Sequence, residues 1–286
     1  MSRSPAARAG SRRARARPVR IAFVRLLSSL GRRALRELWA ARLPVRVVAG
    51  TAVILALIFA LNGLYQVIRK PAEMFFPLSG ALHKTPSETW RQYGPLFREH
   101  STAVMTPELL AALAQVEGSG NPVARTYWRW RLTWNPFEMY QPASSAVGMY
   151  QITNAAFQDA RRYCIHNHAV VEDGPWNDWG SCWFNSLYTR VIPSHAVELT
   201  AAFLDRSVAR TLARQRLTAA ALQQKQDLAA VVHLCGAGTG DAYARRSLQL
   251  TAAARCGDHD VRTYLARVNA MKRYFAWQAA AGNSDR

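Results

Sequence analysis

The chain has 286 residues, half of them hydrophobic, which is enough for one globular core with accessory segments and excludes a disordered composition. A net charge of +19 would suggest a nucleic-acid-binding protein if it were spread along the chain, but it is uneven. Thirteen arginines and one acid, Glu37, lie in residues 1–46, so this leader carries +12 and the other 240 residues carry +7. Most of the charge therefore belongs to the leader.

Apolar residues recur among the arginines of the leader at roughly helical spacing. This pattern is expected for a helix lying on an anionic membrane surface. A solvated topology signal without a binding role explains it equally well. Nucleic-acid binding is the weakest interpretation, because no recognised nucleic-acid motif accompanies the charge, and we expect no nucleic-acid partner. The apolar residues are Ile21, Val24, Leu27, Leu35, Leu38 and Trp39.

Residues 47–68 form a charge-free run of 22 residues. As a helix this run would be about 33 Å long, which matches a hydrocarbon core of about 30 Å, so it predicts one transmembrane helix. The arginines before it should stay in the cytoplasm, which places the globular part on the other side of the membrane. A cleaved signal peptide is the alternative, but the run and the leader are both too long for one.

All four cysteines follow the apolar run, and none forms a CxxC pair typical of a zinc or redox centre. In an oxidising compartment they are expected to form disulfides. Sequence order favours Cys164 with Cys182 and Cys235 with Cys256, although four cysteines allow three pairings and the sequence does not choose among them. Reduced, buried thiols are the alternative.

Residues 69–84 contain prolines and no clear periodicity, which suits a short stem at the membrane surface. The domain then begins with Thr85-Pro86-Ser87-Glu88, a capping-box pattern that predicts a helix to about Arg98. Thr106-Pro107-Glu108 repeats this signal and predicts a second helix, which Gly118 should end.

Later segments also have helical periodicity, and we find no convincing strand pair. An all-helical domain is therefore expected over residues 85–279, with a tail at 280–286. The further helices are expected at residues 155–163, 195–212, 217–234, 240–253 and 260–279.

Glu117 lies at the carboxyl end of the second predicted helix. The negative end of the helix macrodipole makes a carboxyl group there hold its proton more tightly. Apolar residues of the same helix and a nearby tryptophan-rich segment could also keep water away from it, which would make a general acid at neutral pH. Considered alone, a solvent-exposed helix-end glutamate is the more ordinary interpretation.

The motifs around Glu117 occur in a recognisable order. They are Glu117-Gly118-Ser119, Asn121-Pro122, the segment 144–152 (SSAVGMYQI) and the segment 264–268 (YLARV). Together they resemble the motifs of the soluble lytic transglycosylase family, a branch of the lysozyme superfamily, over roughly Thr85 to Ala279. This resemblance implies a mostly α, lysozyme-like helical domain behind the single N-terminal transmembrane helix.

The resemblance also implies roles for individual residues. Glu117 would be the catalytic acid and base, Ser119 the serine that follows it in the active site, and Tyr264 a tyrosine close to the glutamate. A glycine-framed motif would line the glycan groove with Gly148, Met149, Tyr150 and Gln151. Met149 could equally belong to the core, and Gln151 could be a buried amide that satisfies backbone groups.

The chain departs from the family pattern in two places. The family usually has tyrosine and asparagine where this chain has Cys235 and Gly236, which leaves substrate contact at that motif in doubt. The interval between Glu117 and Gln151 is also longer than usual, and the segment 127–134 (YWRWRLTW) fills it. Its rings and arginines could bind sugars and carboxylates, but packing against the domain is the more ordinary role of tryptophans.

Ordinary glycosidases place two carboxylates across the scissile bond, and here a second one is not obvious. Glu138 and Asp159 are the nearest in sequence, and solvated positions are the ordinary expectation for both. The resemblance implies a single-acid scheme, in which Glu117 protonates the β-1,4 oxygen between N-acetylmuramic acid and N-acetylglucosamine. It then takes the proton of the C6 hydroxyl as the 1,6-anhydro ring closes, without metal or cofactor.

The sequence is therefore interpreted as an inner-membrane, single-pass peptidoglycan lytic transglycosylase with a cytoplasmic N-terminus and a periplasmic domain. Its expected partners are glycan strands and inner-membrane lipid. Two alternatives remain: a muramidase that hydrolyses the same bond with a second carboxylate such as Glu138, and an inactive wall-binding scaffold. Service to a secretion or conjugation apparatus is a further hypothesis, suggested only by the pairing of a cytoplasmic leader with a wall-active domain.

Overall fold

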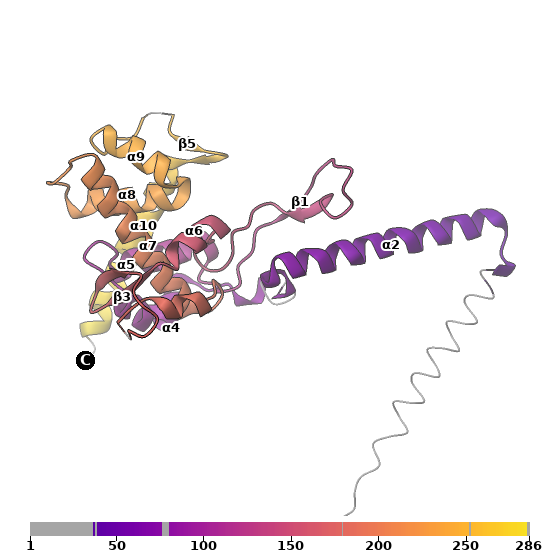
Figure 1. Cartoon of the computed structure of the whole chain (residues 1–286), viewed down its shortest axis with the longest axis horizontal. Coiled ribbons are helices and arrows are strands. Elements are labelled where there is room, and N and C mark those ends of the chain that lie inside the picture. The colour runs from indigo at the N-terminus through magenta and orange to yellow at the C-terminus, as the bar shows by residue number, and fades with distance from the viewer. Residues whose placement is uncertain (1–36, 38, 76–79, 179, 252, 285–286) are drawn as a thin grey trace, which may run out of the picture. The chain divides into compact units, whose positions relative to one another are not determined.

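The computed structural model describes residues 37, 39–75, 80–178, 180–251 and 253–284 (Figure 1). Over these ranges the chain is mostly helical, with eight α-helices and three short strand pairs. It divides into two compact units, residues 1–61 and 62–286. The expected surface helix of the leader, with Ile21, Val24, Leu27, Leu35 and Leu38, lies outside the described residues.

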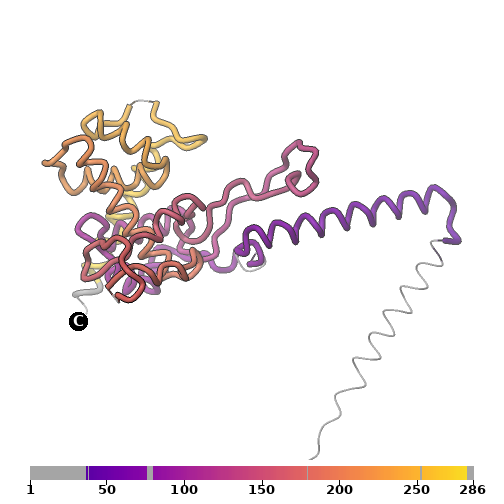
Figure 2. The backbone as a smooth tube through the Cα atoms, viewed as in Figure 1, coloured from indigo at the N-terminus to yellow at the C-terminus, as the bar shows by residue number. Residues whose placement is uncertain are grey.

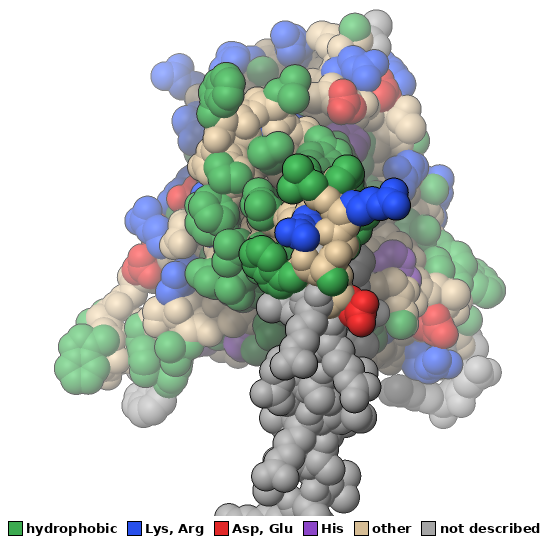
Figure 3. All heavy atoms as spheres, turned by 90° about the vertical axis from the view of Figure 1, so that its right-hand side faces the viewer, with side chains coloured by type: hydrophobic (Ala, Val, Ile, Leu, Met, Phe, Trp, Pro, Cys, Tyr) green, Lys and Arg blue, Asp and Glu red, His purple; other side chains and the backbone are tan. Residues whose placement is uncertain are grey.

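Helix α2 spans Leu43–Arg69 and contains the whole predicted apolar run. It is long and apolar enough to cross a membrane, and most of its large hydrophobic side chains are exposed. Figure 3 shows hydrophobic side chains gathered near the centre of one face of the molecule, with most lysines and arginines toward its edges. Exposed apolar surface of this extent is typical of segments that contact a membrane or another protein.

The first two helices of the globular part begin where the capping signals predicted. In α4 (Pro86–Glu99) the Glu88 carboxylate accepts a hydrogen bond from the Thr85 backbone N–H at 2.8 Å, which completes a capping box. In α5 (Pro107–Gly118) the Thr106 hydroxyl accepts from a backbone N–H of the first turn. Helix α5 ends at Gly118, followed by Ser119 in the left-handed region with φ of 50°.

Helix α5 forms the centre of the core. Its residues 109–114 are at most 1% exposed, and it packs against α4 and α10 (Val261–Ser284). Helices α7 (Pro193–Arg214), α8 (Leu222–Cys235) and α9 (Ala237–Arg245) complete the helical body. Each buried leucine of α5 contributes about 2 kcal/mol relative to an exposed position, so the end of α5 is held firmly in place.

The expectation of an all-helical domain was wrong in detail, because three antiparallel strand pairs interrupt the helices. Helix α6 covers only Asn154–Ala160, and the chain continues into β3 (Tyr163–His166), which pairs with β4 (Ala169–Glu172). Between them Asn167 and His168 have φ of 49° and 62°, as in the two-residue turns that join hairpin strands. The β3–β4 pair therefore depends on its two-residue turn and not on a long periodic sequence pattern.

The other two pairs are equally short. Strands β1 (Trp128–Trp130) and β2 (Tyr140–Pro142) form a hairpin that extends from the helical body (Figure 2). Strands β5 (Arg255–Cys256) and β6 (His259–Asp260) form the third pair, and the helix expected up to residue 253 already ends at Arg245, followed by turns. Strands of two or three residues carry no readable alternation, which is why the sequence pattern did not reveal them.

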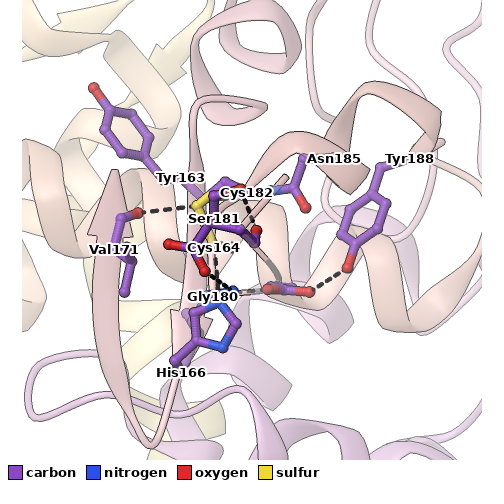
Figure 4. The surroundings of a disulfide bond; sticks show 12 residues. Tyr163, Cys164, His166, Val171, Gly180, Ser181, Cys182, Asn185 and Tyr188 are labelled. Carbon is purple, nitrogen blue, oxygen red and sulfur yellow. Dashed lines mark hydrogen bonds between the residues drawn. A yellow bond between two sulfur atoms is a disulfide. The ribbon is translucent and has the colours of Figure 1, made fainter. Parts of the chain in front are cut away.

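The disulfides join Cys164 to Cys182 and Cys235 to Cys256, which confirms the pairing that sequence order favours. The first joins β3 to the turn before the 3₁₀ helix η3 (Trp183–Leu187) (Figure 4). There the Asn185 side chain donates to the Tyr163 carbonyl at 2.5 Å. The second disulfide fixes the carboxyl end of α8 to strand β5.

The first part of the predicted stem packs into the domain. The 3₁₀ helix η1 (Pro71–Phe75) buries Glu73, which is 3% exposed. Its carboxylate lies 3.0 Å from Lys70 Nζ and 3.2 Å from an Arg125 guanidinium nitrogen. It also accepts the indole N–H of Trp128 at 2.9 Å. Glu73 thus ties the stem to the start of the β1–β2 hairpin.

Candidate functional site

The carboxyl end of α5 meets the first turn of α10. The Tyr264 hydroxyl donates a hydrogen bond to Glu117 Oε1 at 2.5 Å, although the two residues lie 147 positions apart in the chain. The Glu117 side chain is 16% exposed, so it is partly buried and not a free surface group. Of the sequence-predicted site residues, these two are in direct contact.

The tyrosine of this pair is held in its neutral form. Burial raises the pKa of Tyr264 well above its ordinary value of 10, and the neighbouring negative charge of Glu117 and the hydrogen bond to it act in the same direction. The hydroxyl therefore remains a donor across the physiological pH range. It orients one oxygen of the carboxylate.

His233 is a third member of the site, and the sequence interpretation missed it. Its Nε2 lies 3.7 Å from Glu117 Oε1, and its side chain is 11% exposed. It stands in the last turn of α8, after the buried residues 228–232. The one available signal was a basic residue near the end of an otherwise apolar helix.

Close backbone contact holds the glycine-framed motif beside Glu117. A Cβ added at Gly118 would lie 2.8 Å from the backbone of Met149, so only glycine lets the two segments approach this closely. Gly148 has φ of 82°, and a Cβ there would meet the Arg190 carbonyl oxygen. These two glycines explain why the motif after Glu117 and the motif around residue 150 belong to one site.

Met149 and Tyr150 contribute to the core rather than to a groove. Both are 0% exposed. Met149 is therefore a core residue, which was one of its two interpretations, and Tyr150 does not line a groove in this conformation. Burial raises the pKa of Tyr150 well above its usual range. Its hydroxyl has no hydrogen-bond partner among the described residues.

Gln151 and Ser119 both make hydrogen bonds with backbone groups near the site. The Gln151 side-chain N–H groups donate to the carbonyls of Ala124 and Gly148 at 3.1 and 2.9 Å, which matches the interpretation of a satisfied amide. Gln151 nevertheless also lines a cavity. Ser119 ends α5, with its own N–H bonded to the Gln115 carbonyl. Neither residue contacts Glu117 through a hydrogen bond that the described structure contains.

A cavity of about 420 Å³ lies between α6, α7 and the end of α8, and it includes Gln151 and His233 in its wall. This volume is typical of small-ligand sites. Thr200 is among the lining residues, and its hydroxyl is buried without a partner among the described residues, which costs free energy. His233 links the two features, because it lines the cavity and lies 3.7 Å from Glu117 Oε1, whereas Glu117 is not itself a lining residue.

The altered motif at residues 234–238 forms part of this wall. Cys235 is bonded to Cys256, and Gly236 has φ of 80° at the junction of α8 and α9. Both residues line the cavity. The disulfide and the glycine turn therefore shape this part of the wall.

The two carboxylates considered as second acids occupy different places. Asp159 is exposed on α6 and lines the cavity. Glu138 lies in the turn of the β1–β2 hairpin, where the Asn135 side chain donates to it at 3.3 Å, and it is not part of the cavity wall. The aromatic segment 127–134 is likewise absent from the wall.

No protein-family model matches the chain, and no curated protein matches it. Among the residues that the structure describes, no group of three or more His, Cys, Asp and Glu side chains is placed to hold a metal ion. The site is therefore interpreted from its own residues.

Proposed function

We propose that the protein is a peptidoglycan lytic transglycosylase with a lysozyme-like helical domain. The observation that supports this most is the hydrogen bond from Tyr264 to Glu117, made beside a cavity that His233 lines. It gives one partly buried carboxylate an oriented position next to His233, which lines a ligand-sized cavity. Such an arrangement suits a general acid and base.

In the proposed reaction Glu117 acts twice. It first protonates the glycosidic oxygen between N-acetylmuramic acid and N-acetylglucosamine, while the acetamido oxygen of the substrate stabilises the positive sugar. The carboxylate then takes the proton of the C6 hydroxyl, and that oxygen closes the 1,6-anhydro ring. The Tyr264 donor stabilises the carboxylate between the two steps.

His233 approaches the same carboxylate oxygen from the last turn of α8, with its Nε2 3.7 Å from Glu117 Oε1. Together with the Tyr264 hydroxyl, it limits the positions that the Glu117 carboxylate can take. His233 is therefore proposed as a positioning residue for the carboxylate.

Hydrolysis of the same bond is the second candidate function. Asp159 is a better candidate than Glu138 for its second carboxylate, because Asp159 lines the cavity and Glu138 does not. Asp159 lines the cavity and could orient a water molecule across the sugar from Glu117, as the second carboxylate of ordinary glycosidases does. An exposed aspartate on a helix is also common without any function.

We further propose that α2 crosses the inner membrane, with the leader in the cytoplasm and the site in the periplasm. The length and apolar surface of α2 support this, as do the leader arginines. Service to a secretion or conjugation apparatus would need a partner for the leader. A pull-down with residues 1–46 that recovers no component of such an apparatus would count against that hypothesis.

Mass spectrometry of isolated sacculi digested by the full-length protein tests the proposed chemistry. Soluble products with 1,6-anhydromuramic ends are expected. Products with reducing muramic ends would favour hydrolysis, and in that case Asp159→Asn should abolish their release. Sacculus binding without any released product, in both the wild type and Glu117→Gln, would identify a wall-binding scaffold.

A further inference from the structure

The β1–β2 hairpin exposes an unusual amount of apolar surface. Leu132 and Trp134 at its tip are 104% and 103% exposed, and Trp130 is 63% exposed. Neighbouring Tyr127, Phe137 and Met139 are exposed as well. Soluble proteins seldom leave such a group of large hydrophobic side chains in water, and an exposed patch of this kind marks an interaction surface.

The turn of the hairpin is fixed to the last two turns of α2. The Asn62 side chain donates to the Pro136 carbonyl at 2.8 Å, and the Gln66 side chain donates to the Phe137 carbonyl at 2.7 Å. The rings of Tyr65 and Phe137 lie 5.1 Å apart. Two amides in an otherwise apolar helix are thereby satisfied, as polar groups at membrane depth must be.

The base of the hairpin is fixed just beyond the end of α2. Lys70 Nζ donates to the Ser144 carbonyl at 3.2 Å, and Trp128 donates to the buried Glu73. Burial lowers the pKa of Lys70, although its bond to Glu73 acts in the opposite direction. Base and turn are both anchored, so the hairpin has a defined direction and does not hang free.

These anchors set how deep the hairpin reaches. Asn62 and Lys70 are eight residues apart, which is about 12 Å along a helix. Their partners, Pro136 and Ser144, follow the same order, so the hairpin runs back along α2 from its polar end into its apolar part. The turn therefore stands about two helical turns inward from Arg69, where tryptophans of membrane proteins are enriched at the lipid interface.

We propose that the hairpin tip inserts into the lipid leaflet on the side of the globular domain, next to α2. Leu132 and Trp134 would enter the interfacial layer, and the exposed Arg129 and Arg131 would reach lipid phosphates. The inference rests on the proposed passage of α2 through a membrane but not on the glycan chemistry. It gives the domain a second membrane contact, which would hold the cavity at a fixed height above the bilayer.

Quenching of tryptophan fluorescence by brominated lipids tests this with the full-length protein in phosphatidylglycerol-containing vesicles. Trp134 emission is obtained as the difference between wild type and Trp134→Phe. We expect this difference to be lost in brominated vesicles, because bromine near Trp134 quenches it. The matched control is Trp176→Phe, since Trp176 is 79% exposed and lies outside the hairpin. Its difference signal should persist.

Flotation of the vesicles and thermal melting separate the outcomes. Protein that does not float contradicts both the membrane passage of α2 and the hairpin contact. Protein that floats, melts like wild type and keeps an unquenched Trp134 signal overturns the hairpin inference alone, as would be found if a protein partner covers the tip. If melting shows that Trp134→Phe does not fold, Leu132→Asn replaces it, and reduced quenching of total tryptophan emission is expected.

Discussion

Glu73 and Glu117 are both acids withdrawn from water, but their surroundings differ. Glu73 has a side chain that is 1% exposed, with Lys70, Arg125 and the Trp128 indole N–H around its two oxygens. Glu117 is 16% exposed and has one hydroxyl donor, with His233 at 3.7 Å. Glu73 is therefore paired with two cationic side chains, whereas Glu117 has the neutral Tyr264 donor and the nearby imidazole of His233.

Under the proposed function, Glu73 has a structural role and Glu117 a catalytic one. Glu73 is held by two cationic side chains and an indole N–H, and it is not among the residues that line the cavity beside His233. Glu117 has no Lys or Arg ion pair among the described residues, and the neighbouring His233 lines that cavity. Loss of Glu73 should consequently weaken the fold, and loss of Glu117 should stop the reaction and leave the fold intact.

The largest effect is expected from Glu117→Gln. The glutamine amide oxygen can still accept the hydrogen bond from the Tyr264 hydroxyl, but the amide cannot act as an acid or a base. Glycan release should therefore fall by about 10³-fold. Turbidity clearance of sacculi measures the rate, and the melting temperature should stay near the wild-type value. Glu138→Gln, in the hairpin turn, is the matched control and should leave both unchanged. An active Glu117→Gln variant would remove the distinction between the two acids.

Glu73→Gln should instead destabilise the globular part. The substitution removes the charge that pairs with Lys70 and Arg125 and so breaks a largely buried ion pair, which costs about 3 kcal/mol. Chemical denaturation followed by circular dichroism measures this cost, with Glu138→Gln again as the control. The remaining folded protein should cleave glycan at the wild-type rate. Normal stability together with lost activity would reverse the roles assigned to the two carboxylates.

Gly118→Ala probes the close contact that places Glu117. Its Cβ would lie 2.8 Å from the Met149 backbone, and relief of that overlap should cost about 2 kcal/mol and displace the carboxylate. Gly238→Ala is the control, because a Cβ there meets nothing within 4 Å. Thermal melting and glycan release should both fall for Gly118→Ala only. Equal behaviour of the two variants would argue against this contact.

Tyr264→Phe should have the smallest effect, since it removes one donor to a charged group and retains the ring. We expect a rate about tenfold lower, mainly in kcat. Because the pKa of Tyr264 lies well above 10, the hydroxyl stays protonated, and the ratio of wild-type to variant rates should be constant from pH 5 to pH 9. A ratio that falls toward one as the pH rises would show that the tyrosine loses its proton.

The sequence predicted those parts of the fold that local signals determine. The caps at Thr85 and Thr106 located two helix starts, and the apolar run located α2. Sequence order also favoured the disulfides that the structure contains. Three short strand pairs were missed, because two to four residues joined by a turn contain too few positions for a periodic pattern.

The candidate site was predictable only in part. Motif order indicated that Glu117 and Tyr264 belong together, and their hydrogen bond bears this out. Burial of Tyr150 depends on how the motif packs against α5, and the approach of His233 depends on where α8 ends. Both are results of tertiary packing, which the spacing of residues along the chain does not determine.

Hydrogen exchange of Glu117→Gln with and without soluble glycan fragments tests most directly whether the cavity beside Glu117 binds the substrate. This variant should bind fragments without consuming them. The account predicts slower exchange of backbone amides in residues 151–153 and 233–237, which line the cavity, and no change in the hairpin at residues 128–142. Unchanged exchange at the cavity, with protection elsewhere or nowhere, would contradict it.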